Sequence, residues 1–165
     1  MTNLKLTPSS VIKELHNNGV THVVWLPDSE TNFMFQEMSS DSALNIVSVC
    51  REGECLAIAA GLWVGGMTPI VMIQNTGLFE SGDSIRGLGL DVELPVVMMI
   101  GYRGWKRHGQ ITDSAAHFTE PILNAWHINY YLIETDNDTH KITLAFKEAN
   151  TSGKPVVCLM GSEYN

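Results

Sequence analysis

Six short runs of apolar residues, alternating with segments that have helical character, most constrain how this chain folds. Each run is nearly continuous in apolar residues, as in a strand covered on both faces of a sheet rather than on one. The chain has 165 residues, of which 44% are hydrophobic, enough for one domain with a sizeable core. The runs predict strands at residues 21–27, 44–50, 68–75, 94–101, 128–133 and 154–160.

The segments between these runs carry helix start and stop signals. Thr7 before Pro8 is typical of a helix start, and this first helix ends at Asn17 before Asn18 and Gly19. Residues 103–114 have no hydrophobic period and are expected to form a long loop of functional importance. Further helices are expected at residues 30–39, 52–64, 78–90, 116–127 and 135–150.

This alternation predicts an α/β domain with an open, doubly wound and mainly six-stranded parallel sheet, flavodoxin-like, with helices on both faces. Ligands of such sheets bind beyond the carboxyl ends of the strands. The segments that follow strands are therefore candidates for a binding site: residues 27–29, 50–52, 75–77 and the residues from 102 onward.

Charge and composition exclude several classes of protein. The formal net charge is -8 and no lysine or arginine cluster occurs, which argues against a nucleic-acid partner. We expect neither a membrane span nor a signal peptide, and we expect a cytoplasmic protein. The three cysteines, Cys50, Cys55 and Cys158, form no CxxC pair and are expected to be small buried hydrophobes. No histidine spacing or GxSxG motif supports a metal centre or a hydrolase triad.

The segment CREGECLAIAAGLWVGG, which begins at Cys50, places two acids at the start of an apolar helix. A buried carboxylate is costly unless it has a partner. Glu52 follows a strand directly, so it is either an acid of the first helical turn, stabilised by the helix dipole, or a functional group that needs a ligand. Glu54 fits the dipole interpretation better.

Three further segments leave two interpretations open. Asp28 is a catalytic acid or a helix cap. The residues around Gly77 either bring backbone close to a ligand or form an ordinary helix start capped by Thr76. Arg103 lies in the only locally basic segment and either recognises an anionic group or is solvated in a loop.

Taken together, REGECLAIAAGLWVGGMTPIVMIQNTGL, LPVVMMIGYRG and GVTHVVWLPDS resemble the pyrimidine-binding (PYR) domain of thiamine-diphosphate-dependent 2-keto acid decarboxylases. The chain is most similar to sulfopyruvate decarboxylase alpha subunits and to the N-terminal half of phosphonopyruvate decarboxylases. The resemblance covers nearly the whole chain and implies a single PYR domain at residues 1–165.

The resemblance implies roles for individual residues. In the family, a glutamate nine residues before the helix glycine, here Glu52 before Gly61, hydrogen-bonds N1′ of the cofactor's aminopyrimidine and is catalytic. Asp28 would be a second catalytic group near the reacting carbon, with Pro27 beside it. The aminopyrimidine would be lined by Asn75, Thr76, Gly77 and Leu78.

For the substrate, the resemblance implies contacts with Arg103 and His117, since DSAAH at 113–117 is similar to a DEPQH segment of the phosphonopyruvate enzymes. The family usually has Gly-Asn after the equivalent of Gly77-Leu78, whereas this chain has Phe79-Glu80. These two residues would form part of the wall of the cofactor and substrate pocket.

The chain lacks the GDG…N motif through which the family binds diphosphate and Mg2+, and no metal ligands are expected in it. We therefore expect a beta subunit that carries this motif, and active sites formed between the two chains of a hetero-oligomer. The expected reaction is decarboxylation of a small anionic 2-keto acid, sulfopyruvate first and phosphonopyruvate second. A non-catalytic flavodoxin-like binding or regulatory module, or a fragment of a longer fused enzyme, are the alternatives.

Overall fold

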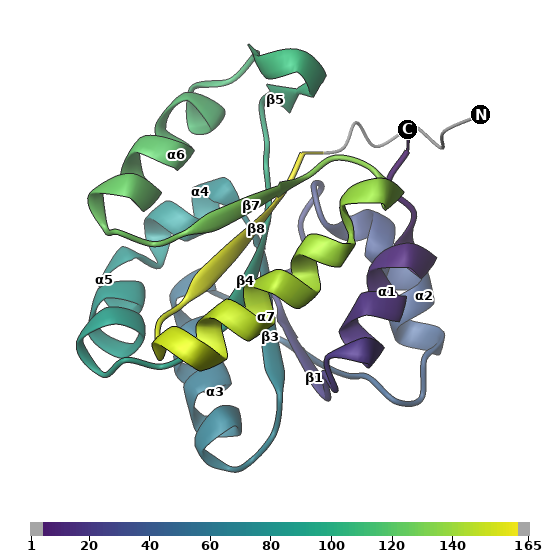
Figure 1. Ribbon diagram of the computed structural model, residues 1–165, viewed down its shortest axis with the longest axis vertical. Coiled ribbons are helices and arrows are strands. Elements are labelled where there is room, and N and C mark those ends of the chain that lie inside the picture. The colour runs from purple at the N-terminus through teal and green to yellow at the C-terminus, as the bar shows by residue number, and fades with distance from the viewer. Residues whose placement is uncertain (1–4, 162–165) are drawn as a thin grey trace.

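The computed structural model describes residues 5–161, without the side chain of His108, and contains one six-stranded parallel sheet in the order β2-β1-β3-β4-β8-β7 (Figure 1). Every neighbouring pair in this sheet is parallel. The expected α/β fold is thereby confirmed. The strands are β1 (His22–Trp25), β2 (Asn45–Ser48), β3 (Pro69–Gln74), β4 (Val97–Gly101), β7 (Tyr130–Ile133) and β8 (Val156–Met160).

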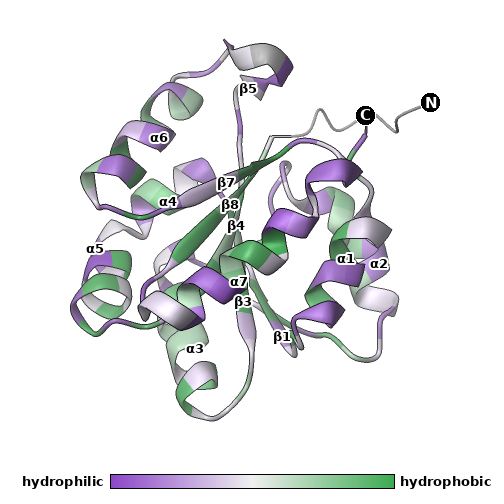
Figure 2. Cartoon of the chain, in the orientation of Figure 1, coloured by the Kyte–Doolittle hydropathy of each residue, from purple (hydrophilic) through white to green (hydrophobic). Residues whose placement is uncertain are grey.

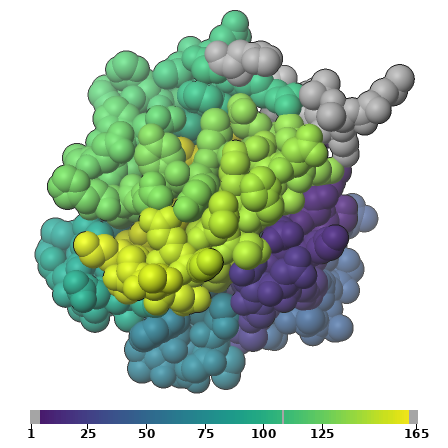
Figure 3. Space-filling model, viewed as in Figure 1, coloured from purple at the N-terminus to yellow at the C-terminus, as the bar shows by residue number. Residues whose placement is uncertain are grey.

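Helices cover both faces of the sheet, as expected. One face carries α1 (Pro8–Asn17), α2 (Phe35–Ser40) and α7 (His140–Ser152), and the atoms of α1 and α7 cover this face in Figure 3. The opposite face carries α3 (Glu52–Val64), α4 (Asn75–Glu80), α5 (Gly82–Ser84), the π-helix η2 (Ile85–Asp91) and α6 (Ser114–Ala125).

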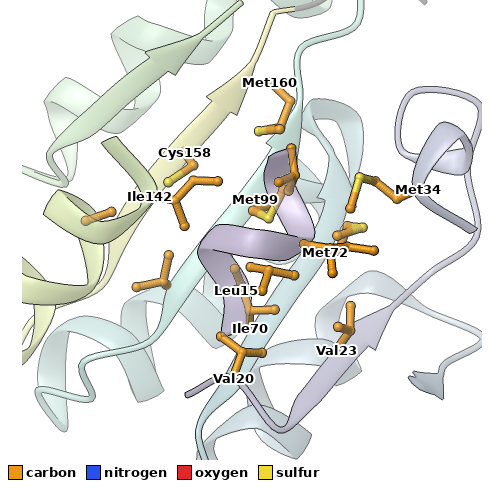
Figure 4. Packing of buried hydrophobic residues seen from close by; sticks show 14 of the residues in the cluster. Leu15, Val20, Val23, Met34, Ile70, Met72, Met99, Ile142, Cys158 and Met160 are labelled. Carbon is orange, nitrogen blue, oxygen red and sulfur yellow. The ribbon is translucent and has the colours of Figure 1, made fainter. Parts of the chain in front are cut away.

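The core consists of two apolar layers on either side of the sheet. Ile70 and Met72 of β3 belong to one layer, whereas Val71 and Ile73 belong to the other, because side chains alternate along a strand. Figure 4 shows the layer beneath α1 and α7, and Figure 2 shows the hydrophobic colour concentrated on the central strands. Each large side chain buried in these layers stabilises the fold by about 1.5–3 kcal/mol.

The local signals set the ends of α1 and α3. Thr7 caps α1, its hydroxyl accepting a hydrogen bond from the backbone N–H of Ser10, and Pro8 takes the first helical position. The helix α3 spans the residues expected for it and ends at Val64, with Gly65 at its C-cap and Gly66 following with a φ of 81°.

Several expected elements differ in detail. The helix expected at 78–90 begins earlier, at Asn75, and is divided into α4, α5 and η2, because three glycines within it weaken a regular helix. The segment expected as a loop at 103–114 contains a small hairpin of β5 (Trp105–Lys106) and β6 (Gln110–Ile111), joined by the 3-10 turn η3 (Arg107–Gly109). Two further 3-10 turns, η1 (Asn32–Met34) and η4 (Asp136–Asp138), precede α2 and α7.

None of the helices formed by residues 5–161 has the length and apolar character that crossing a membrane requires. The expectation that no signal peptide is present depends partly on residues 1–4, which lie outside the described residues. The expectation of three buried cysteines is wrong for Cys50, which is exposed, whereas Cys55 and Cys158 are buried. Cys50 lies beyond the end of β2, outside the covered part of the sheet.

Candidate active site

The carboxyl ends of β1, β2, β3 and β4 lie along one edge of the sheet, and the segments after them carry most of the predicted site residues. Asp28 follows β1, Glu52 follows β2, Gly77 follows β3 and Arg103 follows β4. The parallel arrangement brings these segments together although they are far apart in the sequence.

Glu52 is the first residue of α3, and its half-buried side chain lies directly on Gly77. The Glu52 Cγ would be 2.5 Å, and its Oε1 3.0 Å, from a Cβ placed on Gly77. Within residues 5–161, no hydrogen bond or ion pair reaches the Glu52 carboxylate. This side chain is thus packed against backbone at the edge of the sheet while its carboxylate remains available to a ligand.

Asp28 closes the turn after β1. Its Oδ1 accepts hydrogen bonds of 2.8 Å from the backbone N–H groups of Glu30 and Thr31, and its Oδ2 accepts one of 2.9 Å from the Thr31 hydroxyl. Burial raises the pKa of Asp28, the hydrogen bonds partly oppose this, and the charge of Glu52 raises the pKa further. Asp28 thus caps the turn of residues 29–31 and not a helix, because η1 begins only at Asn32 and has no side-chain cap. The catalytic role stays a prediction. Pro27 beside it is exposed.

Asn75 joins three elements at the start of α4. Its side chain is fully buried, and Nδ2 donates to the backbone carbonyl of Arg103 at 3.0 Å and to the Thr119 hydroxyl at 3.1 Å. Its Oδ1 is buried and has no hydrogen-bond partner among the described residues, and the same holds for Gln74 Oε1. Asn75 therefore fixes the strand ends and leaves one acceptor unused.

The rest of this segment has separate placements. Thr76 is half-buried and does not cap α4, because the helix starts one residue earlier and has no side-chain cap. Leu78 is fully buried within the core on the α3 side of the sheet. The roles of Thr76, Gly77 and Leu78 at a cofactor stay predictions.

Arg103 is paired with a carboxylate of its own chain. Its Nε donates to Asp113 Oδ2 at 3.2 Å, and Asp113 also caps α6 by accepting from the backbone N–H of Ala115 at 2.8 Å. The Ala115 hydrogen bond, and the Arg103 guanidinium, hold the pKa of Asp113 below its usual value. An anion that binds Arg103 must share it with Asp113.

His117 contacts a neighbouring aromatic side chain of its own helix. It is exposed on α6, where its ring contacts the Phe118 ring edge-on with centroids 5.1 Å apart. Within residues 5–161, no hydrogen bond or ion pair links it to Arg103. The structure therefore does not join these two expected substrate contacts directly.

Sequence reasoning missed Glu30, a third carboxyl at this edge. Burial raises the pKa of the half-buried Glu30, and the charge of Asp28 raises it further, whereas Arg103 lowers it. Its Cβ lies 2.5 Å from the place of a Cβ on Gly101, so only glycine fits at that end of β4. A glycine at the end of a buried strand is the signal that could have indicated this close approach.

This edge therefore brings together the carboxyls of Asp28, Glu30 and Glu52 with one guanidinium. Asp28 and Glu30, whose pKa values are raised, can hold or transfer a proton nearer neutral pH than an exposed acid can. In the part of the chain that the structure describes, no cluster of three or more histidine, cysteine or acidic side chains could hold a metal ion. Such a site is suited to proton exchange with a bound polar group.

Comparison with known proteins adds relatives but no family model, since none matches this chain. The chain is 24% identical over 157 residues to the alpha subunit of sulfopyruvate decarboxylase from Methanococcus maripaludis, with 94% of each chain covered. It is 28% identical over 137 residues to phosphonopyruvate decarboxylase from Streptomyces viridochromogenes. That match covers 80% of this chain and 34% of the relative, so the chain spans about a third of the relative's length.

Among solved structures, the fold matches a thiamine diphosphate-dependent 4-hydroxybenzoylformate decarboxylase from Rhodococcus jostii with a TM-score of 0.71. The sequence identity in this match is 16%. The match covers 96% of this chain and 32% of that enzyme. The shared feature is the fold of one part of a larger enzyme.

Proposed function

We propose that this chain, a homologue of the sulfopyruvate and phosphonopyruvate decarboxylases, is the alpha subunit of a thiamine-diphosphate-dependent decarboxylase that converts sulfopyruvate to sulfoacetaldehyde and CO2. Support for the alpha-subunit assignment comes from the relative that is named an alpha subunit and is covered over nearly its full length. We assign residues 1–165 to one PYR domain.

The observation that carries this proposal is the Glu52 carboxylate, half-buried on Gly77 and without a hydrogen bond from the described residues. A ring nitrogen of an aminopyrimidine would supply the missing hydrogen-bond partner of this carboxylate. When bound, thiamine diphosphate supplies the electron sink for loss of CO2. Glu52 would hold the proton at the pyrimidine nitrogen.

Other residues of this edge fit the same ligand. Asn75 Oδ1 is buried without a partner, so a shift of this side chain toward the site would let it accept a hydrogen bond from the amino group of a pyrimidine. The missing side chain at Gly77 lets Glu52 lie close to the backbone, where the ring would meet it with Thr76 and Leu78 beside it. Asp28 and Pro27 would lie near the reacting carbon. The raised pKa of Asp28 suits a group that exchanges a proton with substrate.

For the substrate, the site offers Arg103 and His117. A guanidinium suits the sulfonate of sulfopyruvate because it donates two parallel hydrogen bonds. Since Asp113 already accepts from Arg103, substrate binding would weaken that ion pair. Phosphonopyruvate is the second candidate substrate, favoured by the similarity to the phosphonopyruvate decarboxylases.

We place the diphosphate and Mg2+ on a partner, the beta subunit with its GDG…N motif, in a cytoplasmic hetero-oligomer. The outward face of α3 is a candidate interface because its exposed residues beyond the first turn are small or apolar. They are Ala57, Gly61, Trp63 and Val64. The neighbouring η2 is the second candidate, with Leu88 and Leu90 half-buried. An apolar helix face that stays in water is unfavourable unless a partner covers it.

The test is to purify the tagged chain from its own cells and to measure CO2 release from sulfopyruvate with thiamine diphosphate and Mg2+. We expect activity together with a copurified second chain, and Glu52→Gln is expected to lower it at least about a hundredfold while keeping the chain folded. The melting temperature of Glu52→Gln should equal that of the wild type, because no protein hydrogen bond is lost.

The other outcomes discriminate among the alternatives. Activity that survives Glu52→Gln would remove Glu52 from the mechanism. Activity with phosphonopyruvate alone would change the substrate. No activity and no copurified chain would favour a flavodoxin-like binding or regulatory module.

A further inference from the structure

Glu80, the last residue of α4, contacts both neighbours of Glu52. One carboxylate oxygen, Oε1, accepts from the Nε of Arg51 in an ion pair. The other, Oε2, accepts from the backbone N–H of Gly53 at 2.6 Å. The Arg51 hydrogen bond, with that from Gly53, holds the pKa of Glu80 below its usual value, so the carboxylate is charged.

Ser84, four residues after Glu80, also binds Gly53. Its hydroxyl donates to the backbone carbonyl of Gly53 at 2.9 Å, so both polar groups of Gly53 are bound by the segment that follows β3. The backbone N–H groups of Ser81 and Ile85 bond to the carbonyls of Gly77 and Ser81 at 2.9 Å, so hydrogen bonds hold α4 and α5 together across the turn at Ser81.

Gly77 and Glu80 lie on one face of α4, since residues three apart lie above one another, and Ser84 follows in α5 after the turn at Ser81. Gly77 is the surface on which the Glu52 side chain lies, and Glu80 and Ser84 hold the backbone on its C-terminal side. The segment after β3 thus contacts residues 51, 52 and 53.

The start of α3 needs such an external partner. The first N–H groups of a helix have no partner within it, and a side-chain oxygen at the N-cap usually binds one of them. The N-cap of α3 is Arg51, which has no acceptor and makes no side-chain cap. Glu80 supplies the acceptor instead, and its negative charge suits this end of the helix.

We propose that Glu80 is a positioning residue, which holds the first turn of α3 so that the Glu52 carboxylate stays fixed over Gly77. The effect of this contact on catalysis rests on the proposed function.

The test compares Glu80→Ala and Glu80→Gln with Asp83→Ala. Asp83 belongs to the same open groove beside α3, about 420 Å³ in volume, but its side chain is 90% exposed and pairs with Arg86 at 2.7 Å. Asp83→Ala therefore removes an acid next to Glu80 without touching the residues around Glu52. Thermal unfolding checks that each variant is folded.

The first measurement is amide hydrogen exchange of the full chain, which needs no bound ligand. Glu80→Ala should accelerate exchange of the amides of residues 51–56 by about tenfold or more, because the first turn opens locally. Glu80→Gln, which keeps an acceptor for Gly53 and loses the charge beside Arg51, should have a smaller effect. Asp83→Ala should leave exchange unchanged.

The second measurement is steady-state kinetics of the chain with its copurified partner, thiamine diphosphate and Mg2+. Glu80→Ala should lower kcat about tenfold or more, because misplacing a catalytic group by about 1 Å is costly, while KM for the 2-keto acid stays within about twofold. Glu80→Gln should restore part of kcat.

Two results overturn the proposal in different ways. Exchange that is unchanged in Glu80→Ala, or accelerated equally in Asp83→Ala, would show that Glu80 does not hold α3. A wild-type complex without thiamine-diphosphate-dependent activity would overturn the proposed function and, with it, the catalytic consequence of the contact.

Discussion

The side chain of Glu52 and the backbone of Gly77 are in such close contact that no other residue fits at position 77 without moving the glutamate. A Cβ on Gly77 would lie 2.5 Å from the Glu52 Cγ, well inside van der Waals contact. Gly77→Ala is therefore expected to displace the carboxylate and to lower decarboxylation by about a hundredfold, since small misplacements at a reacting centre are costly. The measurement is kcat of the purified complex.

Gly61→Ala is the matched control for Gly77→Ala, because it makes the same substitution at a glycine with open space around it. Its effect is measured as the thermal stability of the chain alone. Nothing lies within 4 Å of a Cβ on Gly61, so alanine should be stabilising there by about 0.5–1 kcal/mol. Wild-type activity in Gly77→Ala would contradict the placement of Glu52.

Asp28 should give a pH dependence of stability opposite to that of most carboxylates. Its pKa is raised above 3.8 in the folded chain, mainly by burial, so the folded state binds this proton more tightly than the unfolded state. Its contribution is fully present below 3.8 and is lost as the pH rises through the raised pKa. Asp28→Asn keeps an acceptor oxygen and removes this dependence.

We therefore expect the free energy of unfolding of the wild type, minus that of Asp28→Asn, to fall as the pH rises through this window in urea titrations. Asp41→Asn is the control with the opposite sign, because the Ala43 hydrogen bond lowers the pKa of Asp41. Its contribution is present above 3.8 and lost as the pH falls through the lowered pKa. Equal slopes for both variants would contradict the burial of Asp28.

The three thiols should react unequally with iodoacetamide. Burial raises the pKa of both Cys55 and Cys158 to about 12, so almost no reactive thiolate forms there, whereas Cys50 is exposed. Mass spectrometry of the folded, isolated chain should find one modification, at Cys50, and all three after denaturation. Cys50→Ser should then be unreactive when folded, and modification of Cys158 in the folded chain would contradict the core packing.

A large side chain on the outward face of α3 should prevent subunit assembly without unfolding the chain. Gly61 is exposed and has open space around it, so Gly61→Arg is expected to fold with unchanged or higher thermal stability. It should no longer copurify with a second chain. Leu144→Arg, on α7 at the opposite face of the sheet, is the control that should keep the partner, and a retained partner in Gly61→Arg would place the interface elsewhere.

Much of the fold could be predicted because its signals are local. The bounds of α3 follow from an apolar segment with acids at its start and two glycines at its end, and the cap of α1 follows from Thr7 and Pro8. The start of α4 was missed because Asn75 looks like the end of a strand, and its hydrogen bonds depend on Arg103 in the segment after β4 and on Thr119 of α6. The hairpin after β4 was missed because its strands have only two residues each.

By itself, the sequence determined the class of fold, the edge of the sheet where a ligand would bind, and Glu52 as the carboxylate to examine there. These depend on periodicity, caps and the position of residues after strands, all of which are local. Only the tertiary structure decided that the Glu52 side chain lies on Gly77 and that Glu80 binds both neighbours of Glu52. It also decided that Arg103 forms an ion pair with Asp113. The physical reason is that hydrogen bonds and close contacts between loops depend on the order of the strands in space, which no local pattern of residues specifies.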